Sequence, residues 1–382
     1  MPGLRLGVVS TYPPVHCGVG EYTRLLLTAL HGRDLGASIL VMAEEGVGAG
    51  YHDADAGATV RPSFKWGDPS SLDGVLEALA DAGGVDILHV QHEYGIYTTS
   101  TRILDLAAEA RREGLARRIV FTLHTVYHPL AARRGETRFQ EAVLSEADAV
   151  IVHSPQQEFE LHAQAGGYLE KITRIPHGTM VNPYLSTPRP RLASLLGLPS
   201  SVLDGFIAVV PGFLRPDKGL DTLAEAAGMI KGRARIIVAG EPRDEGLLKL
   251  LDGAPGVRLI PRYLSTSEIL MLSALSDVIL LPYRDPPGKY AVSGVLHLSM
   301  GSLKPIIGTN VPRLTELYTL APRLVFRAGD PRGLARLLDT ISRAEAYELV
   351  VPYAGPLYSY AVRTSWPRMA KRHLALYRRL LG

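Results

Sequence analysis

Short apolar runs alternate with longer amphipathic segments along most of the chain. The runs are rich in Val, Ile and Leu, and the segments between them carry apolar residues at the spacing of a helix. Continuous apolar strands that alternate with helices are typical of parallel sheets whose two faces are both covered. The pattern therefore predicts an α/β fold made of open, doubly wound sheets.

The predicted strands form two series, one in each half of the chain. The first series is Leu4–Val9, Ala37–Met42, Val85–Val90, Arg118–Leu123, Ala149–His153 and Lys171–Ile175. The second series is Phe206–Val210, Ala234–Ala239, Val257–Ile260, Asp277–Leu281, Lys304–Ile307 and Arg323–Phe326. Each half is thus expected to hold about five or six strands in a sheet of its own. A helix is predicted over Thr101–Glu113, with Ser100 or Thr101 as its N-cap and Gly114 at its C′ position.

A proline-rich stretch separates the two series. From Thr187 to Ser201 the chain carries prolines at positions 188, 190 and 199 and no convincing strand. We therefore predict an N-terminal domain over residues 1–187 and a second domain over residues 188–363. Residues 364–382 follow as a helix, which is expected to pack back toward the N-terminal domain. Two such domains make the cleft between them the default place for a ligand.

Composition and charge exclude several classes of protein. With 382 residues, 46% of them apolar and 21% charged, the chain is globular and long enough for two cores. Lys and Arg number 41 against 38 for Asp and Glu, an excess too small to indicate a nucleic-acid partner. Cys17 is the single cysteine, which excludes an internal disulfide and a cysteine-based metal site. Neither a secretion signal nor an apolar stretch of membrane-spanning length is found, so a cytoplasmic location is expected.

Two groups of basic residues each have two interpretations. The C-terminal helix carries Arg368, Lys371, Arg372, Arg378 and Arg379 among apolar positions. The N-terminal half carries a second group, Arg111, Arg112, Arg117, Arg118, Arg133 and Arg134. Either group is compatible with a solvated polar surface or with contact to anionic lipid. The second interpretation implies peripheral attachment at the inner face of a membrane.

The loop after the first strand leads directly into a helix. It contains Gly18 and Gly20, which let a backbone approach a ligand closely. The start of the helix also offers unpaired N–H groups to an anion or to hydroxyl groups. A tight strand-to-helix turn explains the two glycines equally well, so both interpretations stay open.

Ionisable side chains gather at the ends of two strands in the same domain. His92 and Glu93 follow one strand, and His124 follows the next strand along the chain. Ligands bind beyond the carboxyl ends of the strands in doubly wound sheets, so these residues are candidates for substrate contact. The neighbouring His89 and His128 are expected to be packing or hydrogen-bonding residues. No spacing typical of a metal site is present, so no metal is expected.

The second domain opens with a basic turn between two glycines. Gly212 and Gly219 bracket a turn that contains Arg215 and Lys218, and a helix begins immediately afterwards. Two cations beside a helix N-terminus suit a diphosphate group, although a solvated basic loop has the same composition. Further along, Ser293, Gly294 and Val295 begin another helix whose N–H groups are available to an anion.

Together these segments resemble the retaining glycosyltransferases of family four, from Leu4 to about Leu317. The resemblance is closest to a branch with a QHEYG-like segment, a TLHT segment and an SG-containing donor loop. Here these are Gln91–Gly95, Leu123–Thr125 and Ser293–Gly294. The resemblance implies the GT-B architecture of two facing Rossmann-like domains. It also implies metal-independent transfer with retention of anomeric configuration, in which the leaving phosphate accepts the proton of the acceptor.

The resemblance assigns a role to each candidate residue. Gly18 and Gly20 would face the acceptor and the transferring sugar, while His92 and Glu93 would line the acceptor side. The role of His124 would be to contact the sugar near the reacting carbon. On the donor side Lys218, with Arg215 and Gly212, would hold the diphosphate. The remaining donor-binding positions are Tyr263 and Leu264, which follow Arg262 and would hold the base, and Ser293, Gly294 and Val295.

Two departures from the family pattern concern the donor. The arginine of the family's phosphate loop is Phe213 here, so Arg215 is expected to assume part of its role. The paired glutamates that family members use on donor hydroxyl groups align near Tyr290 and Leu298, so both carboxylates are missing. The sugar and the nucleotide are therefore not identified by the sequence.

The predicted function is the transfer of a hexose from a nucleotide-diphosphate sugar to a hydroxyl acceptor, either a glycan or a lipid-linked molecule. The nucleotide sugar is a substrate, and no cofactor is expected. Two alternatives remain. The first is a nucleotide-sugar epimerase or hydrolase, which uses the same fold, and the second is a catalytically silent protein that binds a sugar nucleotide.

Overall fold

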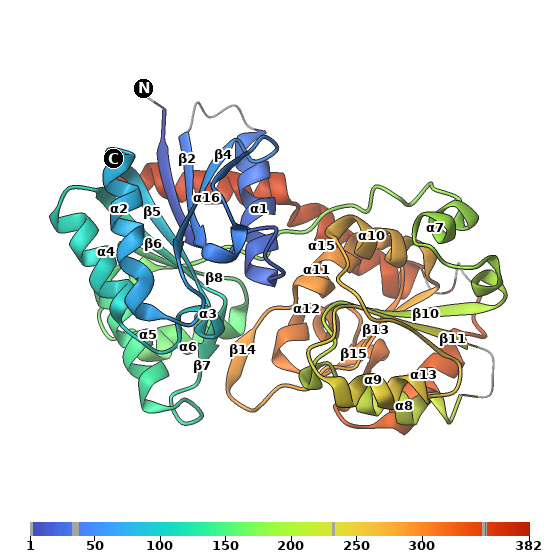
Figure 1. Cartoon of the computed structure of the whole chain (residues 1–382). Helices are drawn as coiled ribbons and strands as arrows, with labels where there is room; N and C mark the ends of the chain where they lie inside the picture. Colours follow the sequence, from blue (N-terminus) through green and yellow to red (C-terminus); the bar gives the residue numbers. More distant parts are fainter. Residues whose placement is uncertain (1–2, 33–37, 231–233, 346–347, 349) are drawn as a thin grey trace. The chain divides into compact units, whose positions relative to one another are not determined.

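A computed structural model describes residues 3–32, 38–230, 234–345, 348 and 350–382 (Figure 1). The chain divides into two compact units. Unit 1 comprises residues 1–178, 287–292 and 366–382, and unit 2 comprises residues 179–286 and 293–365. The chain therefore leaves unit 1, builds most of unit 2, returns briefly to unit 1, and ends in unit 1.

Unit 1 is built on an eight-stranded sheet with the order β3-β4-β2-β1-β5-β6-β8-β9. Its strands are β1 Arg5–Ser10, β2 Ser38–Glu44, β3 Tyr51–Asp53, β4 Ala58–Phe64, β5 Val85–His92, β6 Ala116–Leu123, β8 Ala149–Val152 and β9 Ile172–Arg174. All neighbours are parallel except the edge pair β3 and β4. A separate antiparallel pair joins β7 Thr125–Tyr127 to β14 Lys289–Ala291.

Helices cover the sheet of unit 1. They are α1 Gly18–His31, α2 Asp73–Asp81, α3 Tyr94–Tyr97, α4 Arg102–Arg112, α5 Arg134–Glu146, α6 Pro155–Gln164 and α16 Trp366–Leu381. Local chemistry explains where some of them begin: Ser154 caps α6 through the N–H of Gln157, whose side chain returns to the cap backbone. The C-terminal helix α16 packs against α1 and β6, and Arg118 Nε donates to the carbonyl of Leu380 at 2.7 Å (Figure 1).

Unit 2 is built on a fully parallel six-stranded sheet with the order β12-β11-β10-β13-β15-β16. Its strands are β10 Phe206–Pro211, β11 Ala234–Ala239, β12 Val257–Ile260, β13 Val278–Leu281, β15 Ile306–Thr309 and β16 Val325–Phe326. Its helices are α7 Arg189–Leu195, α8 Leu220–Ala227, α9 Glu245–Asp252, α10 Thr266–Leu275, α11 Gly294–Ser299, α12 Thr315–Leu320, α13 Pro331–Ile341 and α15 Gly355–Arg363. Short 3-10 turns include η5 Pro216–Lys218 and η7 Pro312–Leu314.

The strand order of each unit predicts where a ligand would bind. When the strands of unit 2 are numbered by their order in the chain, their order across the sheet is 3-2-1-4-5-6. The parallel strands of unit 1 follow the same pattern. The direction of winding reverses between β1 and β5 in unit 1 and between β10 and β13 in unit 2. Ligands of doubly wound sheets bind in the crevice beyond the carboxyl ends of these central strands. The loops that follow β1, β5, β10 and β13 are therefore the relevant ones.

The predicted α/β fold with doubly wound sheets is confirmed, with differences in detail. The sheet of unit 1 has eight strands, more than the five or six expected, because the short pair β3 and β4 extends its edge. Both are polar or interrupted by Pro62, so they lack a continuous apolar run. Gly114 has the positive φ of 74° predicted for a helix C′ residue. Residue Ala37, placed in a predicted strand, lies outside the described residues.

Among the described residues, no helix combines the length and the apolar character needed to cross a bilayer.

Candidate functional site

The loop after β1 packs directly against the start of α1. A Cβ atom on Gly20 would lie 3.2 Å from the backbone of Thr11 and Tyr12, so a side chain there would push the helix away from the loop. Gly18 differs, because a Cβ atom on it would meet nothing within 4 Å. Gly20 thus has a packing role, whereas Gly18 leaves the exposed start of α1 open to a ligand.

His124 follows β6 at the carboxyl edge of the sheet. Its Nε2 atom lies 3.0 Å from Oε1 of Gln91, and the ring of Tyr22 from α1 contacts it edge-on at 4.9 Å between centroids. The imidazole is 9% exposed. Burial holds its pKa well below the ordinary value, with smaller contributions from neighbouring histidines, so the ring is neutral. A neutral imidazole has one donor nitrogen and one acceptor nitrogen.

Glu93 lies at the end of the neighbouring strand β5. Its Oε2 atom accepts a hydrogen bond of 2.7 Å from the hydroxyl of Thr125, which follows His124 in the chain. The structure therefore brings Glu93 and His124 to the ends of two adjacent strands. The partly exposed carboxylate retains acceptor capacity for a substrate hydroxyl.

His92 lies on the opposite face of β5 from Gln91 and Glu93, because side chains alternate along a strand. Its ring is fully buried, stacked on Phe139 at 4.0 Å and on Tyr97 at 5.6 Å. Neither ring nitrogen has a hydrogen-bond partner among the described residues, and burial lowers its pKa to about 3. Its side chain thus points into the apolar core of unit 1, although sequence proximity grouped it with Glu93.

In unit 2 the basic turn follows β10 and requires both of its glycines. Gly212 and Gly219 have φ values of 106° and 64°, which side chains with a Cβ atom rarely adopt. A Cβ atom on Gly219 would lie 1.9 Å from the carbonyl oxygen of Pro282, the first residue after β13. One on Gly212 would lie 2.9 Å from Val295. The turn is therefore packed tightly against the segments that follow β13.

Lys218 ends the turn η5, and its side chain is buried at 9% exposure. Its Nζ atom lies 3.8 Å from the ring centroid of Tyr283, a cation–π contact. In the part of the chain that the structure describes, no group accepts a hydrogen bond from Nζ. Burial, and then the charges of Arg313 and Arg215, hold its pKa well below the ordinary value. An anion would relieve this unfavourable environment.

Arg313, on η7 after β15, is a residue that the sequence did not single out. Its Nη1 donates to a carboxylate oxygen of Asp217 at 2.6 Å, and its Nη2 donates to the carbonyl of Arg284 at 2.8 Å and pairs with Asp285 at 2.5 Å. Its guanidinium also lies 4.9 Å from the ring centroid of Tyr283. Arg313 thus ties the basic turn to the loop after β13. The sequence feature that could have identified Arg313 is its position as a cation shortly after the end of β15.

The remaining donor-side residues lie around the same turn. Arg215 is partly exposed and forms a two-point ion pair with Asp217, with distances of 3.0 and 2.9 Å. The ring of Phe213 lies 6.1 Å from that of Tyr263 and 5.0 Å from the guanidinium of Arg243. These rings form an aromatic surface where the family pattern has an arginine.

The SG-containing segment begins the short helix α11. The hydroxyl of Ser293 accepts a hydrogen bond of 3.2 Å from the N–H of Leu296, so it caps the helix. The two positions aligned with the family's glutamates belong to different units. Tyr290 lies in β14 of unit 1, where it pairs with Val126, and Leu298 lies in α11 of unit 2. Leu264 is buried after β12.

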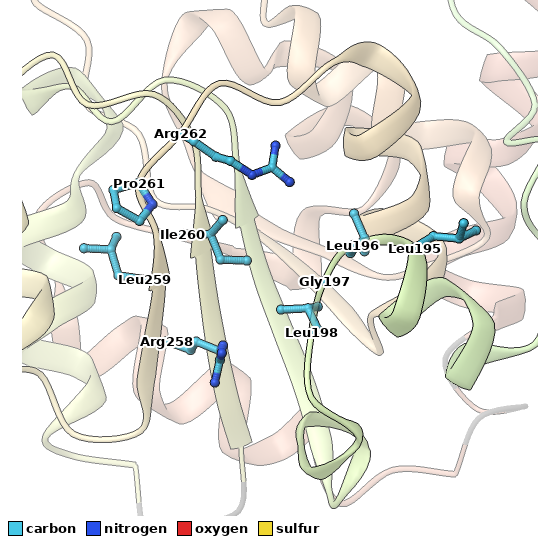
Figure 2. Close-up of a pocket in the computed structure, with 9 residues that line it drawn as sticks. All are labelled: Leu195, Leu196, Gly197, Leu198, Arg258, Leu259, Ile260, Pro261 and Arg262. Atoms are coloured by element: carbon cyan, nitrogen blue, oxygen red, sulfur yellow. The ribbon is translucent and has the colours of Figure 1, made fainter.

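A pocket of about 520 Å³ lies beside β12, the edge strand of unit 2 (Figure 2). Its lining residues come from the end of α7 and the following loop and from β12 and its end: Leu195, Leu196, Gly197, Leu198, Arg258, Leu259, Ile260, Pro261 and Arg262. Arg262 pairs with Glu268 at 2.6 Å and immediately precedes Tyr263. Lys218 and Arg215 are not among the lining residues, so this pocket is separate from the basic turn.

No group of three or more His, Cys, Asp or Glu side chains is arranged to hold a metal ion within the described ranges.

Comparison with known proteins finds a family match for part of the chain. Residues 17–181 match the model of Glycosyltransferase Family 4. Among curated proteins no sequence matches the chain. The matched segment includes Gly18, Glu93 and His124 of unit 1.

Solved structures show the fold of the whole chain. Anabaena Alr3699/HepE, in complex with UDP and glucose, is 18% identical, with a TM-score of 0.74 over 98% of this chain and 99% of that one. The catalytic domain of starch synthase IV from Arabidopsis thaliana, bound to ADP and acarbose, is 16% identical, with a TM-score of 0.70 and 99% of both chains covered. Trehalose 6-phosphate synthase from Burkholderia multivorans is 14% identical, with a TM-score of 0.72 and 99% of both chains covered.

The chain has the GT-B fold of glycosyltransferases. Its two Rossmann-like units correspond to the two domains that the resemblance implied.

The buried imidazole of His92 predicts a substitution that stabilises unit 1. His92→Phe should raise the free energy of unfolding at pH 7 by on the order of 1 kcal/mol, because two unpaired polar nitrogens leave the core. The gain should be larger by about 2 kcal/mol at pH 5, because the unfolded wild type is protonated below about pH 6.5 and the folded protein is not. Denaturant unfolding of the wild type and the variant at pH 7 and pH 5 measures both differences in the free energy of unfolding.

Exposed His162 supplies the control, since His162→Gln should change neither value. If His92→Phe instead weakens the acceptor-dependent reaction at unchanged stability, His92 lines the acceptor site as the sequence suggested.

The ion-pair network around Arg313 predicts a large loss of stability on its removal. Arg313→Ala should lower the free energy of unfolding of unit 2 by about 3–5 kcal/mol, because the buried carboxylate of Asp285 loses its partner. Arg343→Ala breaks an exposed pair with Asp339 and should cost only about 0.5 kcal/mol. Equal effects of the two variants in chemical denaturation would contradict the structural role of Arg313.

Proposed function

We propose that the protein transfers a hexose from a nucleotide-diphosphate sugar to a hydroxyl acceptor, with retention of configuration and without a metal ion. The observation that carries this proposal is the buried ammonium group of Lys218 beyond the carboxyl end of β10, which finds no hydrogen-bond acceptor among the residues that the structure describes. This position is where a Rossmann-like unit binds its ligand. The complexes of the Anabaena protein with UDP and UDP-glucose support a nucleotide sugar as the donor.

Unit 2 is proposed to hold the donor. The diphosphate would lie on Lys218, with Arg215 contributing charge from its more exposed position and Gly212 allowing close backbone approach. Negative charge grows on the leaving phosphate as the glycosidic bond breaks, so fixed cations stabilise the transition state more than the bound substrate. The base would lie against Tyr263 and Leu264, and the N–H groups at Ser293, Gly294 and Val295 would bind polar groups of the donor.

Unit 1 is proposed to hold the acceptor and the reacting end of the sugar. His124 is neutral, so it offers hydrogen bonds to sugar hydroxyl groups without adding a charge. Glu93 would accept a hydrogen bond from the acceptor, and the open start of α1 at Gly18 would approach it through the backbone. The acceptor hydroxyl would attack on the face from which the phosphate leaves, and that phosphate would accept its proton.

Two alternatives have specific support. An epimerase or hydrolase needs the same donor site but no acceptor, so product analysis with and without acceptors distinguishes it. A silent sugar-nucleotide-binding protein is favoured by the absence of both family glutamates at Tyr290 and Leu298. Nucleotide binding without turnover across a broad panel of donors and acceptors would support that alternative.

Lys218 provides the test of the donor site. A thermal-shift screen of UDP-, GDP- and ADP-sugars identifies the donor, because a ligand of the native state raises apparent stability. Lys218→Ala should then lower kcat/KM for that donor by an amount equivalent to about 2–4 kcal/mol. Lys249→Ala, which removes an exposed lysine of α9, should leave kcat/KM unchanged. Equal turnover by Lys218→Ala and wild type would remove Lys218 from the mechanism.

Peripheral membrane contact is proposed for the basic face of α16, which would suit a lipid-linked acceptor. Its cations are all exposed and no acidic residue lies within the helix: Arg368, Lys371, Arg372, Arg378 and Arg379. Replacing Arg378 and Arg379 by Gln should reduce co-sedimentation with anionic vesicles at low salt, since each cation contributes about 1 kcal/mol near such a surface. Binding that is identical for anionic and neutral vesicles would rule the contact out.

A further inference from the structure

A line of buried hydrogen bonds connects His124 with the C-terminal helix inside unit 1. From Nε2 of His124 it passes to Oε1 of Gln91 at 3.0 Å, and from Nε2 of Gln91 to Nε2 of His89 at 3.3 Å. Nδ1 of His89 then lies 2.7 Å from the hydroxyl of Tyr377 on α16. All four side chains are buried, and His89 and Gln91 share one face of β5.

The donors and acceptors in this line are mutually dependent. Burial keeps the pKa values of both histidines well below the ordinary value, so each ring carries one proton. With Oε1 of Gln91 facing His124, Nε2 of His124 must be the protonated nitrogen. The amide nitrogen of Gln91 then donates to Nε2 of His89, so Nδ1 of His89 carries its proton and donates to Tyr377.

We propose that Tyr377 is a positioning residue that sets, through His89 and Gln91, which ring nitrogen of His124 carries the proton. The phenolic oxygen accepts from Nδ1 of His89 and so fixes the order of donors along the line. As a result, Nδ1 of His124 is unprotonated, and its lone pair can accept a hydrogen bond from a sugar hydroxyl. That consequence rests on the proposed function, whereas the proton placement does not.

The structure also contains the alternative arrangement. The hydroxyl oxygen of Thr122 lies 2.8 Å from Nε2 of His89 and can accept a hydrogen bond from that nitrogen when it is protonated. If Tyr377 no longer accepts from Nδ1, His89 is expected to move its proton to Nε2 and donate to Thr122. The amide of Gln91 must then turn over and donate to His124, which reverses the tautomer of His124.

Tyr377→Phe tests this inference by removing a single oxygen from α16. In the full-length protein labelled with ¹⁵N-histidine, nitrogen NMR distinguishes a protonated from a bare ring nitrogen, and His124→Gln identifies the signals of His124. Wild type should show Nε2–H on His124, and Tyr377→Phe should shift the population to Nδ1–H. The inference is overturned if the wild type already carries Nδ1–H or if the variant retains the wild-type tautomer.

Tyr97→Phe is the matched control. It also removes a buried phenolic oxygen from unit 1, but one without a hydrogen-bond partner among the described residues. The His124 signals should be unchanged in this variant. A second variant, Gln91→Leu, interrupts the line and should abolish the preference of His124 for one tautomer. It provides the test if Tyr377→Phe does not fold, and a retained Nε2–H preference in Gln91→Leu would also overturn the inference.

Turnover gives a separate readout. Tyr377→Phe should lower kcat/KM at least tenfold, while the Kd of the nucleoside diphosphate of the donor found in the thermal-shift screen, which unit 2 is proposed to hold, stays unchanged. If no sugar transfer occurs in any variant, the proposed function fails, but the NMR result still decides the placement of the proton. If the tautomer of His124 changes in Tyr377→Phe while kcat/KM does not, the proposed control of the tautomer by Tyr377 stands, but it has no effect on catalysis.

Discussion

Among the described residues the buried cation Lys218 has no hydrogen-bond acceptor, and this constraint shapes the carboxyl edge of the sheet in unit 2. Lys218 is withdrawn from water, and in the described part of the chain the ring of Tyr283 and more distant carboxylates offset the cost. Arg313 makes this arrangement possible, because it holds Asp217 and Asp285 in place and keeps their negative charge directed toward itself. The turn therefore presents a preorganised positive site, and an anion placed there would not need to reorganise it.

Unit 1 depends on a different feature, the alternation of side chains along β5. His89, Gln91 and Glu93 share one face of the strand, and this face carries the polar contacts of His124 and Thr125. His92, between them in sequence, belongs to the other face and packs with Phe139. Because successive side chains of β5 point to opposite faces of the sheet, the hydrogen-bonding residues lie on one face and the aromatic core lies on the other.

The sequence predicted the fold well because apolar runs report buried parallel strands directly. Strands such as β11 and β12 were predicted to the residue, whereas β3 and β4 lack the apolar run that would mark them. Residues next to strand ends, such as His124 and Lys218, could be named as candidates for the same reason. Tyr377 could not be found in this way, because its hydrogen bond with His89 joins residues far apart in the chain. Arg313 follows β15 and carries the same signal as Lys218, but the ion pairs that distinguish it join residues distant in sequence. Adjacency in sequence also misplaced His92, since it does not reveal which face a side chain occupies.

The path of the chain has a consequence for synthesis on the ribosome. N-terminal domains usually fold as soon as they emerge, while the rest of the polypeptide is still being made. Here unit 1 includes β14 and α16, so its sheet acquires its last helix only after all of unit 2 has been translated. A chain that stops prematurely would therefore leave one face of α1 and β6 uncovered, and completeness of the C-terminus is a condition for a finished N-terminal unit.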